Sequence, residues 1–94
     1  MNSELTALNT ATQVKRHYKV LGHAMIYGDA ILASKRVWND KKNAYDHHAA
    51  IFSILKPGAD DAHTSVMLAA ESDEAFSDQG HAFAWAIGMA TARN

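Results

Sequence analysis

The hydrophobic positions of this chain recur mostly at intervals of three, four or seven residues, the period of an α-helix. One stripe follows Thr10 and consists of Val14, Tyr18, Leu21, Met25 and Leu32. A second set, on a neighbouring helical face, consists of Val20, Ala24, Tyr27 and Ile31. The spacing predicts a first long helix over 10–38 that is buried on more than one side.

Local signals mark the start of this helix and a weakness within it. Thr10 and Gln13 have the spacing of a capping box, in which each side chain accepts a hydrogen bond from a free backbone N–H of the other. Gly22 and Gly28 each cost about 1 kcal/mol relative to Ala inside a helix. We therefore expect a helix that begins near Thr10 and has a kink or break at one of the glycines.

The pattern predicts a second helix from Lys41 to about Leu55, with Asp40 as its N-cap. Its apolar stripe consists of Ala44, His48, Ile51, Phe52 and Leu55. Pro57 and Gly58 end the element, because proline disfavours α geometry in the residue before it and supplies no backbone N–H.

Helical spacing continues to the C-terminal part of the chain. Asp60 or Asp61 would cap a third helix through Glu71, and Ser72 or Asp73 a fourth to Ala92, unless the two form one bent helix. The β-branched residues are scattered and no Asn-Gly or Asp-Gly dipeptide signals a hairpin. The predicted fold class is all-α, a bundle of three to four helices in a single domain over residues 1–94.

The last predicted helix carries a seam of apolar residues beside a stripe of small ones. The residues of this region that would pack closely are Phe76, Gly80, Phe83, Ala84, Ile87 and Gly88. Small residues four positions apart let two helix backbones approach each other. Either this helix is wedged into its own core, or the face joins two copies. A chain of 94 residues buries a modest core, so we expect completion by homo-oligomerisation.

Composition restricts the function classes. The chain has no cysteine, which excludes disulfides, thiolate metal sites and cysteine nucleophiles. No apolar run approaches the roughly 20 residues that span a bilayer, and the first residues do not resemble a signal peptide. We expect a soluble, cytoplasmic protein.

Charge is sorted by position along the chain. Between residues 14 and 42 there are two acidic residues and seven basic ones: Lys15, Arg16, Lys19, Lys35, Arg36, Lys41 and Lys42. Between residues 59 and 79 there are six acidic residues and no Lys or Arg, although the whole chain has a net charge of only −1. Separated charge of this kind favours docking on a partner, or neutralisation of one segment by the other.

The basic segment also fits nucleic-acid binding through phosphate contacts, with Tyr18 and Trp38 nearby. Two observations oppose it. The sequence pI is about 6.6, and the best position for a helix-turn-helix leads into an acidic segment, which a DNA groove would repel. The acidic residues that would instead meet a protein partner are Asp60, Asp61, Glu71, Glu74 and Asp78.

The six histidines raise the question of metal binding. Glu71, Glu74, Asp78 and His81 would share one helix face, and Asp46, His47 and His48 could add ligands. Consecutive histidines point about 100° apart on a helix, so His47 and His48 fit one ion poorly. A solvated acidic face explains the pattern as well. We predict no metal site, no cofactor and no catalytic residue, and no GxSxG, HExxH, Walker A or GxGxxG motif occurs.

The function predicted from these observations is a small non-enzymatic interaction protein. It would be a regulator or inhibitor of a larger macromolecular machine, of the size of a phage or mobile-element accessory protein, acting through its charged helix surfaces. One alternative is a nucleic-acid-binding helical protein that uses the basic 14–42 face. Another is a small metal-dependent helical enzyme.

Overall fold

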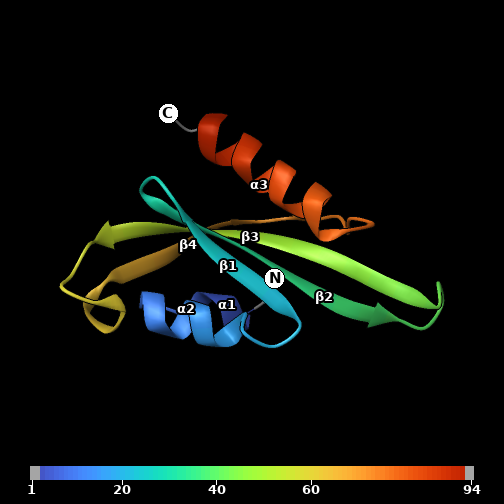
Figure 1. Ribbon diagram of the computed structural model, residues 1–94, viewed down its shortest axis with the longest axis horizontal. Coiled ribbons are helices and arrows are strands. Elements are labelled where there is room, and N and C mark those ends of the chain that lie inside the picture. Colours follow the sequence, from blue (N-terminus) through green and yellow to red (C-terminus); the bar gives the residue numbers. More distant parts are fainter. Residues whose placement is uncertain (1–2, 93–94) are drawn as a thin grey trace.

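The protein is a four-stranded antiparallel sheet with helices on both faces (Figure 1). We describe a computed structural model of the chain over residues 3–92. The strands follow one another in the order β1-β2-β3-β4. Their bounds are Gly22–Tyr27, Ala30–Asn39, Ala44–Lys56 and Ser65–Glu71. The helices are α1 (Ser3–Thr6), α2 (Ala11–His17) and α3 (Gln79–Ala92), and a 3₁₀ turn, η1, covers Asp61–His63.

The prediction of an all-α bundle is therefore wrong. Residues 22–56, predicted to be mainly helical, form three successive strands. The glycines that suggested a helix kink have other roles. Gly22 begins β1, and Gly28 has a φ of +62° in the two-residue turn between β1 and β2. A positive φ at the first turn position is the type II′ hairpin geometry, which Gly28-Asp29 supplies.

The strands resembled helices because both faces of the central sheet are buried. On β2, Ile31 and Ala33 face the N-terminal helices, while Ala30 and Leu32 face α3. All four are nearly inaccessible to solvent. A strand covered on both faces is apolar at every position, so the alternation that identifies a half-exposed strand is lost.

The N-terminal layer confirms one local prediction. Thr10 is the N-cap of α2, and the reciprocal capping box with Gln13 is present. The helix ends at His17. Its Val14, together with Tyr18 just after it, packs on Phe52 and Ile31 of the sheet, where Tyr18 and Phe52 meet edge to face.

The C-terminal layer is α3, which the sequence located correctly but started too early. The helix begins at Gln79, and the backbone N–H of His81 donates to the Asp78 carboxylate at 2.8 Å, so Asp78 caps it. Ala82 and Ala86 are fully buried against β2 and β3. Their small side chains let the helix lie close to the sheet.

The remaining predicted helices are also corrected. The segment 41–55 is a turn followed by β3, which ends at Lys56 directly before Pro57. Asp60 caps only the short η1, and the rest of the predicted third helix is β4. Within residues 3–92 no helix combines the length and apolar character required to cross a membrane.

Candidate functional site

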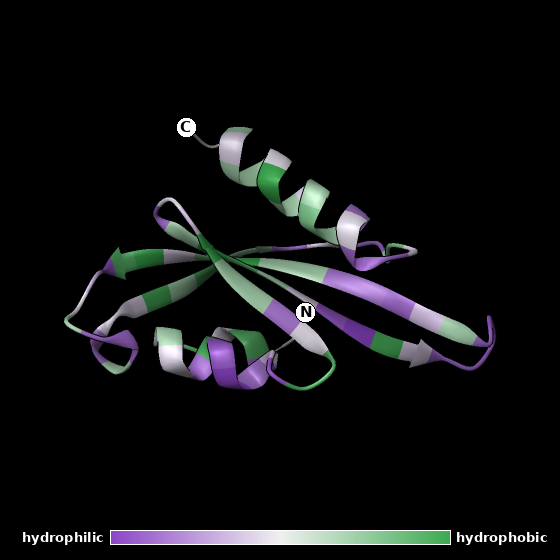
Figure 2. Cartoon of the chain, in the orientation of Figure 1, coloured by the Kyte–Doolittle hydropathy of each residue, from purple (hydrophilic) through white to green (hydrophobic). Residues whose placement is uncertain are grey.

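The β2–β3 hairpin continues beyond the body of the sheet as a two-stranded arm, residues 35–48. Here β2 and β3 remain paired from Lys35 with His48 to Asn39 with Ala44, while Gly22 is the last β1 residue paired with β2. In Figure 1 the arm runs to a turn past the helices. Figure 2 shows that the same two strands are hydrophobic in the body of the sheet and mainly hydrophilic in the arm.

One face of the arm presents a ladder of cationic and aromatic side chains, on the same side of the sheet as α3. We call Arg36, Trp38, Tyr45 and His47 the arm ladder. The Arg36 guanidinium lies 4.7 Å from the centroid of the Tyr45 ring. The Trp38 ring meets Tyr45 edge to face, with 5.1 Å between centroids. Trp38 is 48% exposed and Tyr45 39%, so both rings are available to a ligand.

The tip of the arm is a turn that displays two lysines. The Asn39 side-chain oxygen accepts from the backbone N–H of Lys41, and Asn43 adopts a φ of +53°. Asp46 accepts from the Asn39 amide at 2.8 Å and from Lys42 Nζ at 3.0 Å. These hydrogen bonds, Asn39 first, hold the pKa of Asp46 below its usual range.

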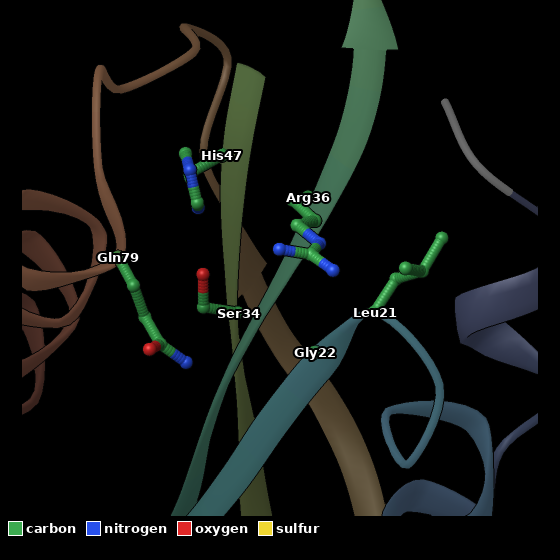
Figure 3. A pocket seen from close by; sticks show the side chains of 6 residues that line it. All are labelled: Leu21, Gly22, Ser34, Arg36, His47 and Gln79. Atoms are coloured by element: carbon green, nitrogen blue, oxygen red, sulfur yellow. The ribbon is translucent and has the colours of Figure 1, made fainter. Parts of the chain in front are cut away.

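A polar cavity of about 270 Å³ lies at the base of the arm (Figure 3). We call it the Ser34 cavity. Its lining residues are Leu21, Gly22, Ser34, Arg36, His47 and Gln79. Ser34 is 1% exposed, and its hydroxyl has no hydrogen-bond partner among residues 3–92. Figure 3 shows this hydroxyl directed into the space between His47, Gln79 and Arg36.

Backbone contacts fix the walls of the Ser34 cavity. The Arg36 N–H donates to the Leu21 carbonyl at 2.8 Å, and Leu21 itself has a φ of +60°. His47 exchanges two backbone hydrogen bonds with Phe76, at 3.0 and 2.8 Å. Gly22 is required beside Ser34, because a Cβ there would lie 2.5 Å from the Ser34 carbonyl oxygen. The cavity is thus assembled by the sheet and the loop before α3.

A second cavity of about 240 Å³ lies on the opposite face of the same two strands. Lys35 and His48 line it together with His17, Tyr18 and Glu71. Burial, followed by the charge of Lys35, lowers the pKa of His17, against a smaller opposing effect of Glu4. Burial, followed by the charge of Glu71, raises the pKa of the Tyr18 hydroxyl far above its usual range. This cavity therefore combines the Lys35 cation with the Glu71 carboxylate.

The structure distributes the predicted basic residues over several surfaces. Lys15, Arg16 and Lys19 belong to α2 and the residues after it, on one side of the sheet. Lys35 and Arg36 are consecutive in a strand, so they point to opposite faces. Lys41 and Lys42 occupy the arm tip. The continuous basic helix face expected from the sequence is not formed.

The predicted acidic residues are also separated. Asp61 pairs with Lys15 at 2.7 Å, which joins the acidic segment to the basic one as the charge pattern allowed. Asp60 caps η1 and contacts His63. Glu71 ends β4, Glu74 lies in the following loop, and Asp78 pairs with His81. The hydrogen bonds from His81 lower the pKa of Asp78.

The candidate metal ligands do not converge. Glu71, Glu74, Asp78 and His81 were predicted to share a helix face, but a strand end, a loop and a helix start carry them. Across residues 3–92 no three His, Asp or Glu side chains gather in a way that could hold a metal ion. His48 is exposed on the arm rather than buried in a helix stripe.

The predicted self-association residues divide into two sets. Phe76, Phe83 and Ile87 are partly buried against the protein's own core. For these three residues, the interpretation of a helix packed into its own domain is therefore the one that applies. Gly80, Ala84 and Gly88 lie exposed along α3. Association of two copies through this outer stripe stays a prediction.

Sequence reasoning missed most of the candidate site. It included Arg36 among the basic residues, noted Trp38 as a nearby aromatic and treated His47 as a possible metal ligand. It missed Ser34, Tyr45 and Gln79 as site residues. One usable signal was the two-residue spacing of Arg36 and Trp38 and of Tyr45 and His47, which places each pair on one face of a strand. The register then pairs Arg36 with His47 and Trp38 with Tyr45.

One comparison with known proteins gives a result. A family model described as nucleotide modification associated domain 4 matches residues 5–90. The match includes all strands, the arm and nearly all of α3. No curated protein and no solved structure matches the chain.

Proposed function

The chain belongs to the nucleotide modification associated domain 4 family, and from this membership we propose that it is a nucleic-acid-binding domain of a nucleotide-modifying system. In this proposal the arm binds single-stranded nucleic acid. The domain contributes binding, and no catalytic step is assigned to it.

The observation that carries the proposal is the exposed arm ladder. Tyr45 contacts both the Arg36 guanidinium and the Trp38 ring, and both aromatic rings are partly open to solvent. Exposed aromatic rings beside an arginine are the stacking platforms on which single-stranded bases bind, because every base has a π face. The Trp38 indole N–H is already donated to Asp40 at 2.7 Å, which fixes the ring in place.

The charge of the arm supports phosphate contacts along the same path. Apart from Lys35, which points to the opposite face, the arm contains three Lys or Arg and two Asp, and both aspartates already accept hydrogen bonds from arm side chains. Lys41 and Lys42 at the tip and Arg36 at the base would bracket a strand that stacks on the two rings. Neutralised phosphates release counterions, so binding should weaken as salt rises.

Fluorescence anisotropy with a labelled single-stranded oligonucleotide tests the proposal. Trp38→Ala should weaken binding about 5- to 150-fold, the loss of roughly 1–3 kcal/mol of base stacking. Replacing Lys41 and Lys42 by Gln should reduce the salt dependence, with each lost contact lowering the slope of log affinity against log salt by about 0.7.

Met67→Ala provides the matched control. Met67 is 58% exposed on β4 and pairs with Ser53, at the end of β3 remote from the arm. Its replacement removes a large exposed apolar side chain and should leave affinity unchanged. Equal effects of Trp38→Ala and Met67→Ala, or no binding at low salt, would reject the proposal.

A protein-docking regulator is the second candidate, favoured by the acidic loop before α3. Asp73 and Glu74 are exposed there, and the loop is tied to the arm through the bridge between Phe76 and His47. Charge reversal at Asp73 and Glu74 should then abolish capture of a partner from the native host and leave oligonucleotide binding intact.

A further inference from the structure

We infer that the Ser34 cavity binds a terminal phosphate, a phosphomonoester carried by a nucleotide or by the end of a nucleic-acid strand. The inference rests on the proposed function and adds a chemical class and a second set of residues to it. The arm ladder supplies the stacking surface, and the cavity at its base supplies the phosphate subsite.

The Ser34 hydroxyl is buried at the floor of the cavity without a partner among residues 3–92. The side chain lies on the central strand β2, between His23 of β1 and Ala49 of β3, and is 99% buried. A buried hydroxyl without a hydrogen bond is unfavourable, and nearly all buried polar groups in proteins have a hydrogen-bond partner. Its orientation into the cavity (Figure 3) indicates that a ligand atom reaching the floor would supply that partner.

The side chains that line the cavity form a set of hydrogen-bond donors. The Ser34 hydroxyl, the Arg36 guanidinium, the Gln79 amide and the His47 ring can all donate hydrogen bonds. Among residues 3–92 no carboxylate lines the cavity; Asp78 lies outside this lining and is hydrogen-bonded to His81. Such a lining favours an anion. An arginine at the wall adds the charge-assisted, two-pronged geometry that suits phosphate oxygens.

The number of free oxygens on the phosphate group favours a phosphomonoester over a phosphodiester. A phosphomonoester has three free oxygens, whereas a phosphodiester within a strand has two and must leave the cavity on both sides. Four donors on one floor and its walls match the monoester better. The second cavity, on the other face of the arm, includes Glu71 and is less suited to such an anion.

The test measures binding of a nucleoside monophosphate, its unphosphorylated nucleoside and inorganic phosphate by isothermal titration calorimetry. In parallel, oligonucleotides with a phosphate or a hydroxyl at either end are compared by anisotropy. We expect the monophosphate to bind and the nucleoside to bind at least tenfold more weakly. If phosphorylated oligonucleotides bind more tightly than those with hydroxyl ends, the ligand is the end of a strand. If the two kinds of oligonucleotide bind equally and the monophosphate still binds, the ligand is a free nucleotide.

Ser34→Ala distinguishes a ligand role from a structural one. It should reduce the preference for phosphate by about tenfold or more, and at the same time raise the melting temperature, because the substitution removes a buried hydroxyl that has no partner. Lys35→Ala is the matched control, since it removes a neighbouring charge from the opposite face of the same strand. It should leave the phosphate preference intact.

Failure of the cavity proposal can be distinguished from failure of the nucleic-acid proposal. If oligonucleotides bind through Trp38 but phosphorylated and hydroxyl ends bind equally and the monophosphate does not bind, the cavity proposal is wrong and the nucleic-acid proposal stands. If the monophosphate binds in a Ser34-dependent way but no oligonucleotide binds, the nucleic-acid proposal is wrong instead. A Ser34→Ala protein that keeps full phosphate preference overturns the cavity proposal.

Discussion

The body of the sheet and its arm are built from the same two strands but have different surroundings. In the body, Ile31 and Phe52 face one layer of helix and Leu32 and Ile51 face the other, all completely buried. In the arm, Trp38 and Tyr45 of the same strands are exposed. Burial explains the residues of the body. The exposed rings of the arm contribute little to the core, which is why we propose that they bind a ligand.

The largest expected effect is in the body. Phe52→Ala should lower the free energy of unfolding by about 3–5 kcal/mol, because it removes a fully buried ring and leaves a cavity beside Tyr18. Trp38→Ala should lower it by about 1 kcal/mol or less, since the ring is half exposed and has one aromatic partner. Urea denaturation measures both. Similar losses would show that the arm is part of the core.

The boundary between body and arm is tested at Gly22. A Cβ at this position would lie 2.5 Å from the Ser34 carbonyl oxygen and 3.0 Å from that of Tyr18. Both obstacles are backbone atoms, so the chain must shift. Gly22→Ala should lower the free energy of unfolding by about 1–3 kcal/mol and also displace a wall of the Ser34 cavity. A variant as stable as the native protein would contradict this packing.

Gly88→Ala is the opposite case and a smaller effect. Gly88 lies in α3, and within residues 3–92 a Cβ there would have no atom within 4 Å apart from its chain neighbours and the backbone of its own helix. Alanine should raise the free energy of unfolding by up to about 1 kcal/mol through its helix propensity. Thermal denaturation measures the gain. A loss would indicate that the outer face of α3 is covered, as the predicted self-association requires, and light scattering would then show a dimer.

The smallest effect expected is a change in how the free energy of unfolding depends on pH in acid. The pKa values of Asp46 and Asp78 are lowered in the folded state by hydrogen bonds, so these groups stabilise the fold above their ordinary pKa near 3.9. That contribution is lost as the pH falls through the lowered values. Asp46→Asn combined with Asp78→Asn should flatten the decline in stability below about pH 4.

Asp73→Asn combined with Glu74→Gln is the charge-matched control for the acid experiment. It also removes two carboxylates, both exposed in the loop before α3. Its profile of unfolding free energy against pH should keep the native steepness. If the double variant declines as steeply as the native protein, the hydrogen bonds to Asp46 and Asp78 do not contribute.

The sequence predicted local features better than the fold. The capping box at Thr10 and Gln13, the boundary at Pro57 and most of α3 depend on neighbouring residues, and all three are present. The central parts of β2 and β3 were missed because burial on both faces made their positions apolar, and an alanine-rich composition favours helix. Gly28-Asp29 carried a hairpin signal that was not used.

The candidate site was less predictable for a related reason. Arg36, Lys41 and Lys42 were recognisable as cations, but their grouping with Tyr45 depends on cross-strand register, which a helical interpretation cannot supply. Ser34 carries no distinctive signal in the sequence. Its significance comes from burial without a partner, which only the folded arrangement shows.

The most direct test of the account is an NMR titration of the isotope-labelled protein with single-stranded oligonucleotide at low salt. Backbone amide shifts should change along the arm, residues 35–48, and at Ser34 and Gln79, and should remain unchanged around η1 and the β4 end near Met67. No shift changes, or changes confined to α2 and η1, would contradict the assignment of nucleic-acid binding to the arm.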